Sequence, residues 1–197
     1  MPNRLSDFKK ALAFGGARPN LFEVTISAGT LPDGVTPFDD EDFTMLCKAA
    51  QLPASNVASI DVPFRGRTFK VAGDRTFDTW TITVINDNDF KIRKSMEEWM
   101  QYVAQYEDGS GATTPQTYMR DALVHQLGRQ KSNVGSGTNN ASGEGLEKVK
   151  TYVFKDIFPT NVSAIDLSFD SSDTIEEFTV EFQVQYWYPG AENAPAG

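Results

Sequence analysis

Alternation of apolar and polar residues is the dominant pattern in this chain. In the run from Phe178 to Tyr186, even positions are apolar and odd positions are polar without a break. Because side chains of a strand point alternately to two faces, this run predicts a strand with one dry and one wet face. Shorter runs rich in Val, Ile, Thr and aromatic residues predict further half-buried strands. These runs lie at residues 22–26, 43–49, 60–64, 69–71, 80–84 and 165–169.

One segment has a helical period instead of an alternating one. Its apolar residues are Phe90, Ile92, Met96, Trp99, Met100, Val103 and Tyr106. This spacing predicts a helix, with N-cap oxygens from residues 86–89 and a glycine-rich end at 108–111. We expect the apolar side of this helix to lie over an open end or face of the sheet.

Other segments are less regular. Residues 118–127 fit either a helix or a strand, and residues 149–158 predict a strand that stops at Pro159. Residues 29–42 and 132–145 are rich in Gly, Pro, Asp, Ser and Asn, which predicts two exposed, mobile loops within a domain of residues 17–188. We expect residues 189–197 to form a flexible tail.

The first 16 residues predict a short N-terminal arm. Leu5, Phe8 and Leu12 fall at helical spacing, and Gly15 and Gly16 follow them. Such an arm either docks on a neighbouring subunit or folds back on its own domain, and the sequence favours neither.

Composition limits the classes of function. The chain has 197 residues, of which 40% are hydrophobic, and a net charge of -9. This length and composition predict one globular domain. The negative charge argues against nucleic-acid binding by phosphate neutralisation. No segment approaches the roughly 20 apolar residues of a membrane span, so we expect no membrane anchoring.

The sequence offers little catalytic chemistry. His125 is the only histidine and Cys47 the only cysteine, and Cys47 alternates with apolar residues as a core thiol does. We therefore expect no enzyme activity, no catalytic residue, no metal site and no cofactor. Against the acidic background, Arg65, Arg67, Lys70 and Arg75 form a basic cluster. This cluster is either a surface that meets acidic patches of another copy or a solvated hairpin.

Five segments in order resemble the tail tube proteins of contractile-tailed bacteriophages. The resemblance runs from about residue 18 to residue 187. Its most specific stretch is Val-Ala-Gly-Asp-Arg-Thr-Phe at residues 71–77. Asp74 lies in this stretch next to Arg75 of the basic cluster, and it is a further candidate contact residue. The five segments are residues 17–22, 71–77, 78–86, 158–162 and 175–187.

The resemblance implies a mainly β fold and a structural role. In that family a β-sandwich or barrel-like domain with one flanking α-helix forms hexameric rings joined by an inter-subunit β-barrel. The rings stack into a conduit for DNA ejection. Implied partners are further copies, the tail sheath, baseplate and terminator proteins, and, in the lumen, the tape-measure protein and genomic DNA. The implied location is the virion tail, assembled in the host cytoplasm.

The polar strand faces are the candidate lumen wall, because an acidic wall repels the DNA backbone. The candidate lumen-facing residues are Thr79, Thr81, Thr83, Thr179, Glu181, Gln183 and Gln185. Alternatives within the same class are the inner tube of a type VI secretion or phage-derived injection system, and a tube-like baseplate subunit. A carbohydrate-binding sandwich is a distant alternative, in which Tyr186, Trp187 and Tyr188 stack on sugars.

Overall fold

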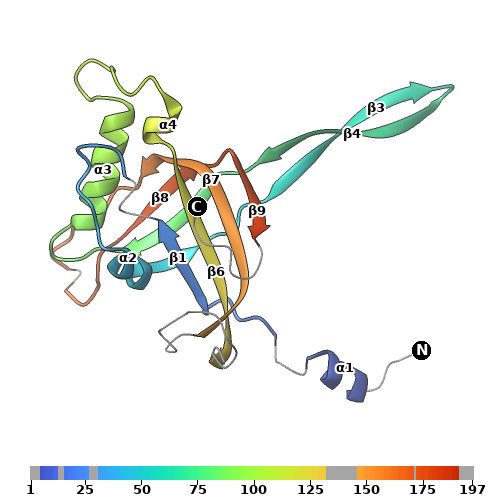
Figure 1. Ribbon diagram of the computed structural model, residues 1–197, viewed down its shortest axis with the longest axis horizontal. Helices are drawn as coiled ribbons and strands as arrows, with labels where there is room; N and C mark the ends of the chain where they lie inside the picture. Colours follow the sequence, from blue (N-terminus) through green and yellow to red (C-terminus); the bar gives the residue numbers. More distant parts are fainter. Residues whose placement is uncertain (1–4, 13–15, 27–30, 132–145, 171, 191–197) are drawn as a thin grey trace, which may run out of the picture.

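A mixed body of strands and helices carries two thin projections in the computed structural model (Figure 1). The structure describes residues 5–12, 16–26, 31–131, 146–170 and 172–190. Helix α1, Leu5–Ala11, lies apart from the body, with Leu5 and Phe8 exposed. The predicted arm is therefore helical, whereas the predicted loop at residues 132–145 lies outside the described residues.

The body is built on a seven-stranded antiparallel sheet. Its strand order is β1-β6-β7-β8-β5-β2, with β9 paired to β7. The predominance of strands confirms the predicted mainly β class. The strands are β1 Phe22–Ile26, β2 Cys47–Ala50, β5 Trp80–Ile85, β6 Arg120–Lys131, β7 Leu146–Val162, β8 Glu177–Gln183 and β9 Tyr186–Gly190.

The long strand β7 links the two halves of this sheet. Its first half pairs with β6 and β9, and its last residues pair with β8. Asp156 marks the change, because its φ of 55° is a left-handed conformation that bends the strand. The predicted stop at Pro159 was wrong: Pro159 lies inside β7 opposite Phe182, next to a register shift that accommodates its missing N–H.

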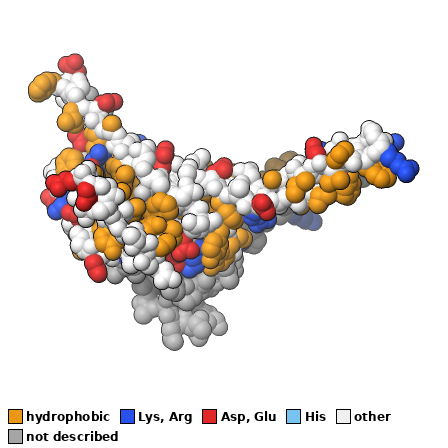
Figure 2. All heavy atoms as spheres, turned by 90° about the horizontal axis from the view of Figure 1, so that it is seen from above, with side chains coloured by type: hydrophobic (Ala, Val, Ile, Leu, Met, Phe, Trp, Pro, Cys, Tyr) orange, Lys and Arg blue, Asp and Glu red, His pale blue; other side chains and the backbone are white. Residues whose placement is uncertain are grey.

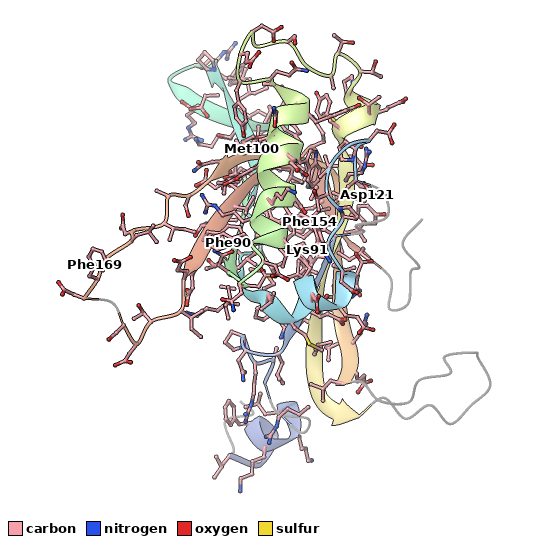
Figure 3. The ribbon with its side chains drawn as sticks, turned by 90° about the vertical axis from the view of Figure 1, so that its left-hand side faces the viewer. Phe90, Lys91, Met100, Asp121, Phe154 and Phe169 are labelled. Carbon is pink, nitrogen blue, oxygen red and sulfur yellow. The ribbon has the colours of Figure 1, made fainter. Side chains whose placement is uncertain are left out.

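The core lies between the sheet and the helices. Trp80 stacks on Phe154 with ring centroids 4.7 Å apart, and Phe182 packs against Trp80 at 5.3 Å. Helix α3, Lys91–Val103, covers this cluster and adds Trp99, whose Nε1–H donates to the Tyr118 carbonyl (2.8 Å). Figure 3 shows α3 in front of the sheet, with Phe154 of β7 beside the helix.

The predicted helix is confirmed, although its start differs in detail from the expectation. Phe90 occupies the N-cap with φ 53°, and the Asp87 carboxylate accepts the Lys91 N–H (3.2 Å). A short helix α4, Pro115–Tyr118, precedes β6, so the ambiguous segment 118–127 is mainly strand.

Two predicted strands do not form as expected. Residues 43–46 belong to helix α2, Asp40–Leu46, because the Asp39 carboxylate accepts the Glu41 N–H (2.9 Å) and acidic residues fill the first turn. Cys47 then begins β2 and is buried, as predicted. Residues 165–169 form no strand and lie in the exposed connection between β7 and β8.

The long C-terminal alternation is also interrupted. The chain leaves β8 after Gln183, bends at residues 184–185 and re-enters the sheet as β9. Trp187 therefore packs inward against Tyr152 and Phe77, whereas Tyr186 and Tyr188 are exposed. Tyr186, which the alternating run assigned to the dry face of a single strand, is therefore not part of the core. β9 extends to Gly190, so the predicted tail begins later than expected; residues 191–197 lie outside the described part.

The predicted loop at residues 29–42 is only partly a loop. Residues 27–30 are not described, and residues 40–42 begin α2. Between them, Val35 and Phe38 are buried in the core, and the Thr36 N–H donates to Glu98 of α3 (2.6 Å). The segment is thus packed against α3 rather than wholly exposed.

Candidate assembly interface

The largest projection is a long hairpin of β3, Ser55–Phe64, and β4, Arg67–Phe77 (Figure 1). Phe64 pairs with Arg67, so only Arg65 and Gly66 form the turn. Their φ angles of 44° and 79° are both positive, as in the type I′ turns that match the twist of paired strands. The hairpin pairs with no other strand in the described chain and forms a sheet of its own.

One face of this hairpin is apolar and open to solvent. Val62 pairs with Phe69, and Ile60 pairs with Val71, so these four side chains share a face with Phe64. Phe64 and Phe69 are each 66% exposed. Figure 2 shows hydrophobic side chains running along one side of the hairpin. A continuous apolar strip of this kind marks a surface for another protein chain.

The opposite face of the hairpin is polar. It carries Ser59, Thr68 and the ion pair between Lys70 Nζ and Asp61 Oδ1 (3.1 Å). Both members of this pair are more than half exposed, so the pair adds little stability. The hairpin therefore has one apolar and one polar face, like the strands of the body. Unlike those strands, its apolar face is not covered by any other described element.

The structure places the five candidate contact residues on the β3–β4 hairpin, in two groups. Arg65 and Arg67 lie at the tip, where the Arg65 guanidinium sits over the Phe64 ring (5.5 Å), and Lys70 follows on β4. Asp74 and Arg75 lie nearer the body, beyond an irregularity between Val57 and Ser59 of β3. All five are exposed. Their contacts with other subunits stay a prediction.

A second surface is the polar face of β5 and β8. Thr81 pairs with Glu181, and Thr83 pairs with Thr179, on the side of the sheet opposite to the buried Trp80 and Ile82. Gln183 extends this face at the end of β8. Thr79 precedes β5 and Gln185 follows β8, so these two candidates flank the ladder rather than belong to it. The other five lie together on one half-exposed face.

The titratable groups inside the body have structural roles. Burial lowers the pKa of His125, and nearby Lys148 lowers it further; the His125 Nδ1 lies 2.9 Å from the Thr151 hydroxyl. Burial raises the pKa of the Cys47 thiol to about 12, which leaves almost no thiolate for nucleophilic chemistry. Among the described residues, no group of His, Cys, Asp and Glu has the arrangement of a metal site.

Within the ranges that the structure describes, no helix is long and apolar enough to cross a membrane.

The sequence prediction missed one exposed feature, the connection between β7 and β8. Leu167 and Phe169 were assigned to a half-buried strand, but they and Ile175 are exposed to solvent. The interleaved Ser and Asp residues at 168, 170, 172 and 173 were the available signal for a turn-rich segment.

Comparison with known proteins shows the family of this chain. The family described as "Phage tail tube protein" matches residues 17–189. The chain belongs to the phage tail tube protein family. The tail tube protein gp19 of Enterobacteria phage T4 is 34% identical over 184 residues, covering 93% of this chain and 98% of that protein.

Other relatives and folds agree with the family. The tail tube protein of Serratia phage KSP90 is 26% identical over 182 residues, covering 91% of this chain and 93% of that protein. A chain of the anti-feeding prophage baseplate matches the fold with a TM-score of 0.60, at 12% identity, over 91% of this chain and 98% of that one. A chain of an extracellular contractile injection system, in its sheath–tube complex, has a TM-score of 0.55 at 12% identity, over 93% and 97%.

Membership of the tail tube family makes this chain a structural subunit of a phage tail and not an enzyme. The surfaces that matter for such a subunit are those that meet other subunits, and the exposed hairpin is the candidate that projects furthest from the body.

Proposed function

We propose that this tail tube protein forms hexameric rings that stack into a hollow tube, through which genomic DNA leaves the virion. The observation that carries the proposal is the β3–β4 hairpin, whose apolar face has nothing to pack against in the described chain. A long strand pair with open edges is stable in solution only when other strands or faces cover it. Further copies of the same chain are the simplest cover.

The polar face of β5 and β8 is the proposed lumen wall. Thr81, Thr83 and Thr179 supply short neutral side chains, and Glu181 supplies negative charge between them. Neutral and acidic side chains predominate on this wall, and Lys48 beside it is held in an ion pair by Glu177, so DNA phosphates bind weakly and DNA slides past. An inter-subunit β-barrel that continues this sheet around the ring also removes its open edges.

The proposed partners follow from the same assembly. Solved structures of similar fold come from a baseplate, a sheath–tube complex and a sheath/tube terminator, which supports binding of this tube to a sheath, a terminator and a baseplate. The tape-measure protein is the proposed occupant of the lumen before DNA, and the host cytoplasm is the proposed place of assembly. The arm of residues 1–16 and the loops within 29–42 and 132–145 are further proposed contacts of the domain at 17–188.

Electron microscopy of the purified protein tests this function. The protein is concentrated and screened across salt, with and without tail baseplates of the same phage. Hollow rods or six-fold rings are the expected result, and rods only with baseplates would show that the tube needs a nucleus. A protein that stays monomeric under both conditions would contradict the proposal.

A further inference from the structure

Besides the hairpin and helix α1, the molecule carries a shorter projection at the end opposite to the hairpin (Figures 1 and 2). It is the connection between β7 and β8, described at residues 163–170 and 172–176 and called the acidic connection below. Phe169 points away from the body (Figure 3) and is fully exposed, and Leu167 is 80% exposed. Nothing in the described chain covers these side chains.

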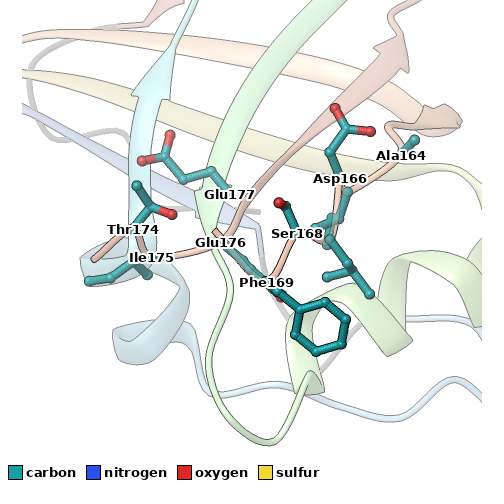
Figure 4. Close-up of a pocket in the computed structure, with 10 residues that line it drawn as sticks. Ala164, Asp166, Ser168, Phe169, Thr174, Ile175, Glu176 and Glu177 are labelled. Atoms are coloured by element: carbon teal, nitrogen blue, oxygen red, sulfur yellow. The ribbon is translucent and has the colours of Figure 1, made fainter. Parts of the chain in front are cut away.

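The acidic connection lines a hollow of about 610 Å³ (Figure 4). Ile165, Leu167, Phe169 and Ile175 supply its apolar lining, and Asp166 and Glu176 supply carboxylates. The volume and the mixed lining suit the docking of side chains from another surface.

Charge in this connection is of one sign. The described residues include Asp166, Asp170, Asp173 and Glu176 and no Lys or Arg. Glu176 accepts a hydrogen bond from the Asn86 amide (3.1 Å), but Asp166, Asp170 and Asp173 form no ion pair within the described chain. Three carboxylates beside exposed apolar side chains therefore lack a cationic partner.

The hairpin tip has the complementary chemistry. Phe64 is exposed and is flanked by Arg65 and Arg67, neither of which forms an ion pair within the described residues. An aromatic side chain bordered by two guanidinium groups matches an apolar hollow bordered by carboxylates, because arginine binds carboxylates with two parallel hydrogen bonds. Aromatic and Arg side chains are also the commonest anchors of protein interfaces.

We propose that the hairpin tip of one copy docks into the acidic connection of a second copy. The proposal rests on the proposed function, since it names the contact that joins tube subunits. The hairpin tip and the acidic connection project from opposite ends of the folded molecule, so they cannot contact each other within one subunit. A contact between two different surfaces repeats from copy to copy, giving a ring if the rotation closes and an open stack if it does not.

Disulfide trapping tests the contact directly. Arg67→Cys and Asp170→Cys are made in separate chains, mixed, assembled and oxidised without reducing agent. The native Cys47 is buried and does not compete. The matched control pairs Arg67→Cys with Gln101→Cys, an exposed position on α3. A covalent dimer of the first pair, at least about tenfold above the control, is expected, because a disulfide forms only when the two Cα atoms approach within about 7 Å.

The outcomes separate this inference from the proposed function. If tubes form without the covalent dimer, the docking contact is overturned but the proposed tube function stands, and the acidic connection is then free to bind a sheath protein. The dimer without tubes would support the contact and contradict the tube. Neither dimer nor tubes would overturn both.

A charge exchange supplies a second test that does not depend on cysteine geometry. Arg65→Asp with Arg67→Asp, or Asp166→Arg with Asp170→Arg, each raises the protein concentration needed for assembly by at least about tenfold, because like charges then face each other. Combining all four changes in one chain restores complementarity and assembly. All variants keep the melting temperature of the parent, since the altered side chains are exposed. A combined variant as defective as the separate ones would overturn the proposal.

Discussion

The apolar face of the hairpin gives the sharpest quantitative prediction. Val62 and Phe69 face each other across β3 and β4 and are 44% and 66% exposed. Replacing both by Ser removes the apolar surface that assembly covers but leaves the core of the body unchanged. We expect folded monomer that assembles poorly.

The size of the effect follows from the exposed fractions. Full burial of a Val or Phe side chain contributes about 1.5–3 kcal/mol, so covering the exposed parts of these two contributes roughly 2–3 kcal/mol per contact. At about 1.4 kcal/mol per tenfold, the critical concentration for tube assembly rises roughly 30- to 140-fold. The monomer loses only the cross-strand pair, about 0.2–1 kcal/mol, which lowers its melting temperature by at most about 4 °C.

Sedimentation across a concentration series measures the critical concentration, and calorimetry of the dilute monomer measures the melting temperature. The matched control is Thr68→Ser with Ala72→Ser on the polar face of the same hairpin. An unchanged critical concentration would refute the reasoning, as would a control variant with the same defect as the test variant.

Further predictions concern the body of the subunit. Burial lowers the pKa of His125, so the unfolded chain binds the imidazole proton more tightly than the folded chain does. The buried neutral imidazole therefore contributes stability that is complete above about pH 6.5. This stability is lost as pH falls through the lower pKa of the folded state. His125→Gln should flatten the fall in melting temperature between about pH 7 and 5, and a slope equal to that of the parent would contradict this. Cys47 should react with a thiol reagent only after denaturation, and rapid labelling of native protein would show that it is accessible. Asp156→Val should lower stability by about 1–2 kcal/mol because a β-branched residue disfavours the left-handed φ of 55°, whereas Asp156→Gly should not; denaturant unfolding compares them, and equal stabilities would rule out backbone strain. Glu181→Lys should slow DNA ejection from assembled particles if its face lines the lumen, and unchanged ejection kinetics would place that face elsewhere.

The sequence patterns predicted strands and helices best where the apolar positions of the pattern are also buried within the single chain. β1 and β5 follow the expected runs, and their apolar positions Val24, Ile26, Trp80 and Ile82 are buried. Helix α3 was equally clear because its period and its buried side agree. Local hydrogen bonds explain the failure at residues 43–46: the Asp39 cap stabilises a helix there, although the apolar alternation favoured a strand.

The candidate interface was only partly predictable, because an apolar residue does not reveal what will cover it. Ile60 and Val62 alternate just as Trp80 and Ile82 do, yet they are exposed on the hairpin. The basic cluster was predictable as a group, since its residues are close in sequence. Its suggested counterpart around Phe169 was not, because the same alternation there had been assigned to a strand.

The exposed apolar surfaces of two copies could also pair in the wrong combination, and the charges on the hairpin and the acidic connection disfavour such pairings. Arg65 and Arg67 at the tip repel the tip of another copy, so two hairpins meet tip to tip only against like charge. Carboxylates on the acidic connection disfavour pairing of two connections in the same way. Tip-to-connection pairing is the arrangement in which these charges attract. The same residues that attract the correct surface therefore disfavour the symmetric pairings that would yield closed dimers in place of a tube.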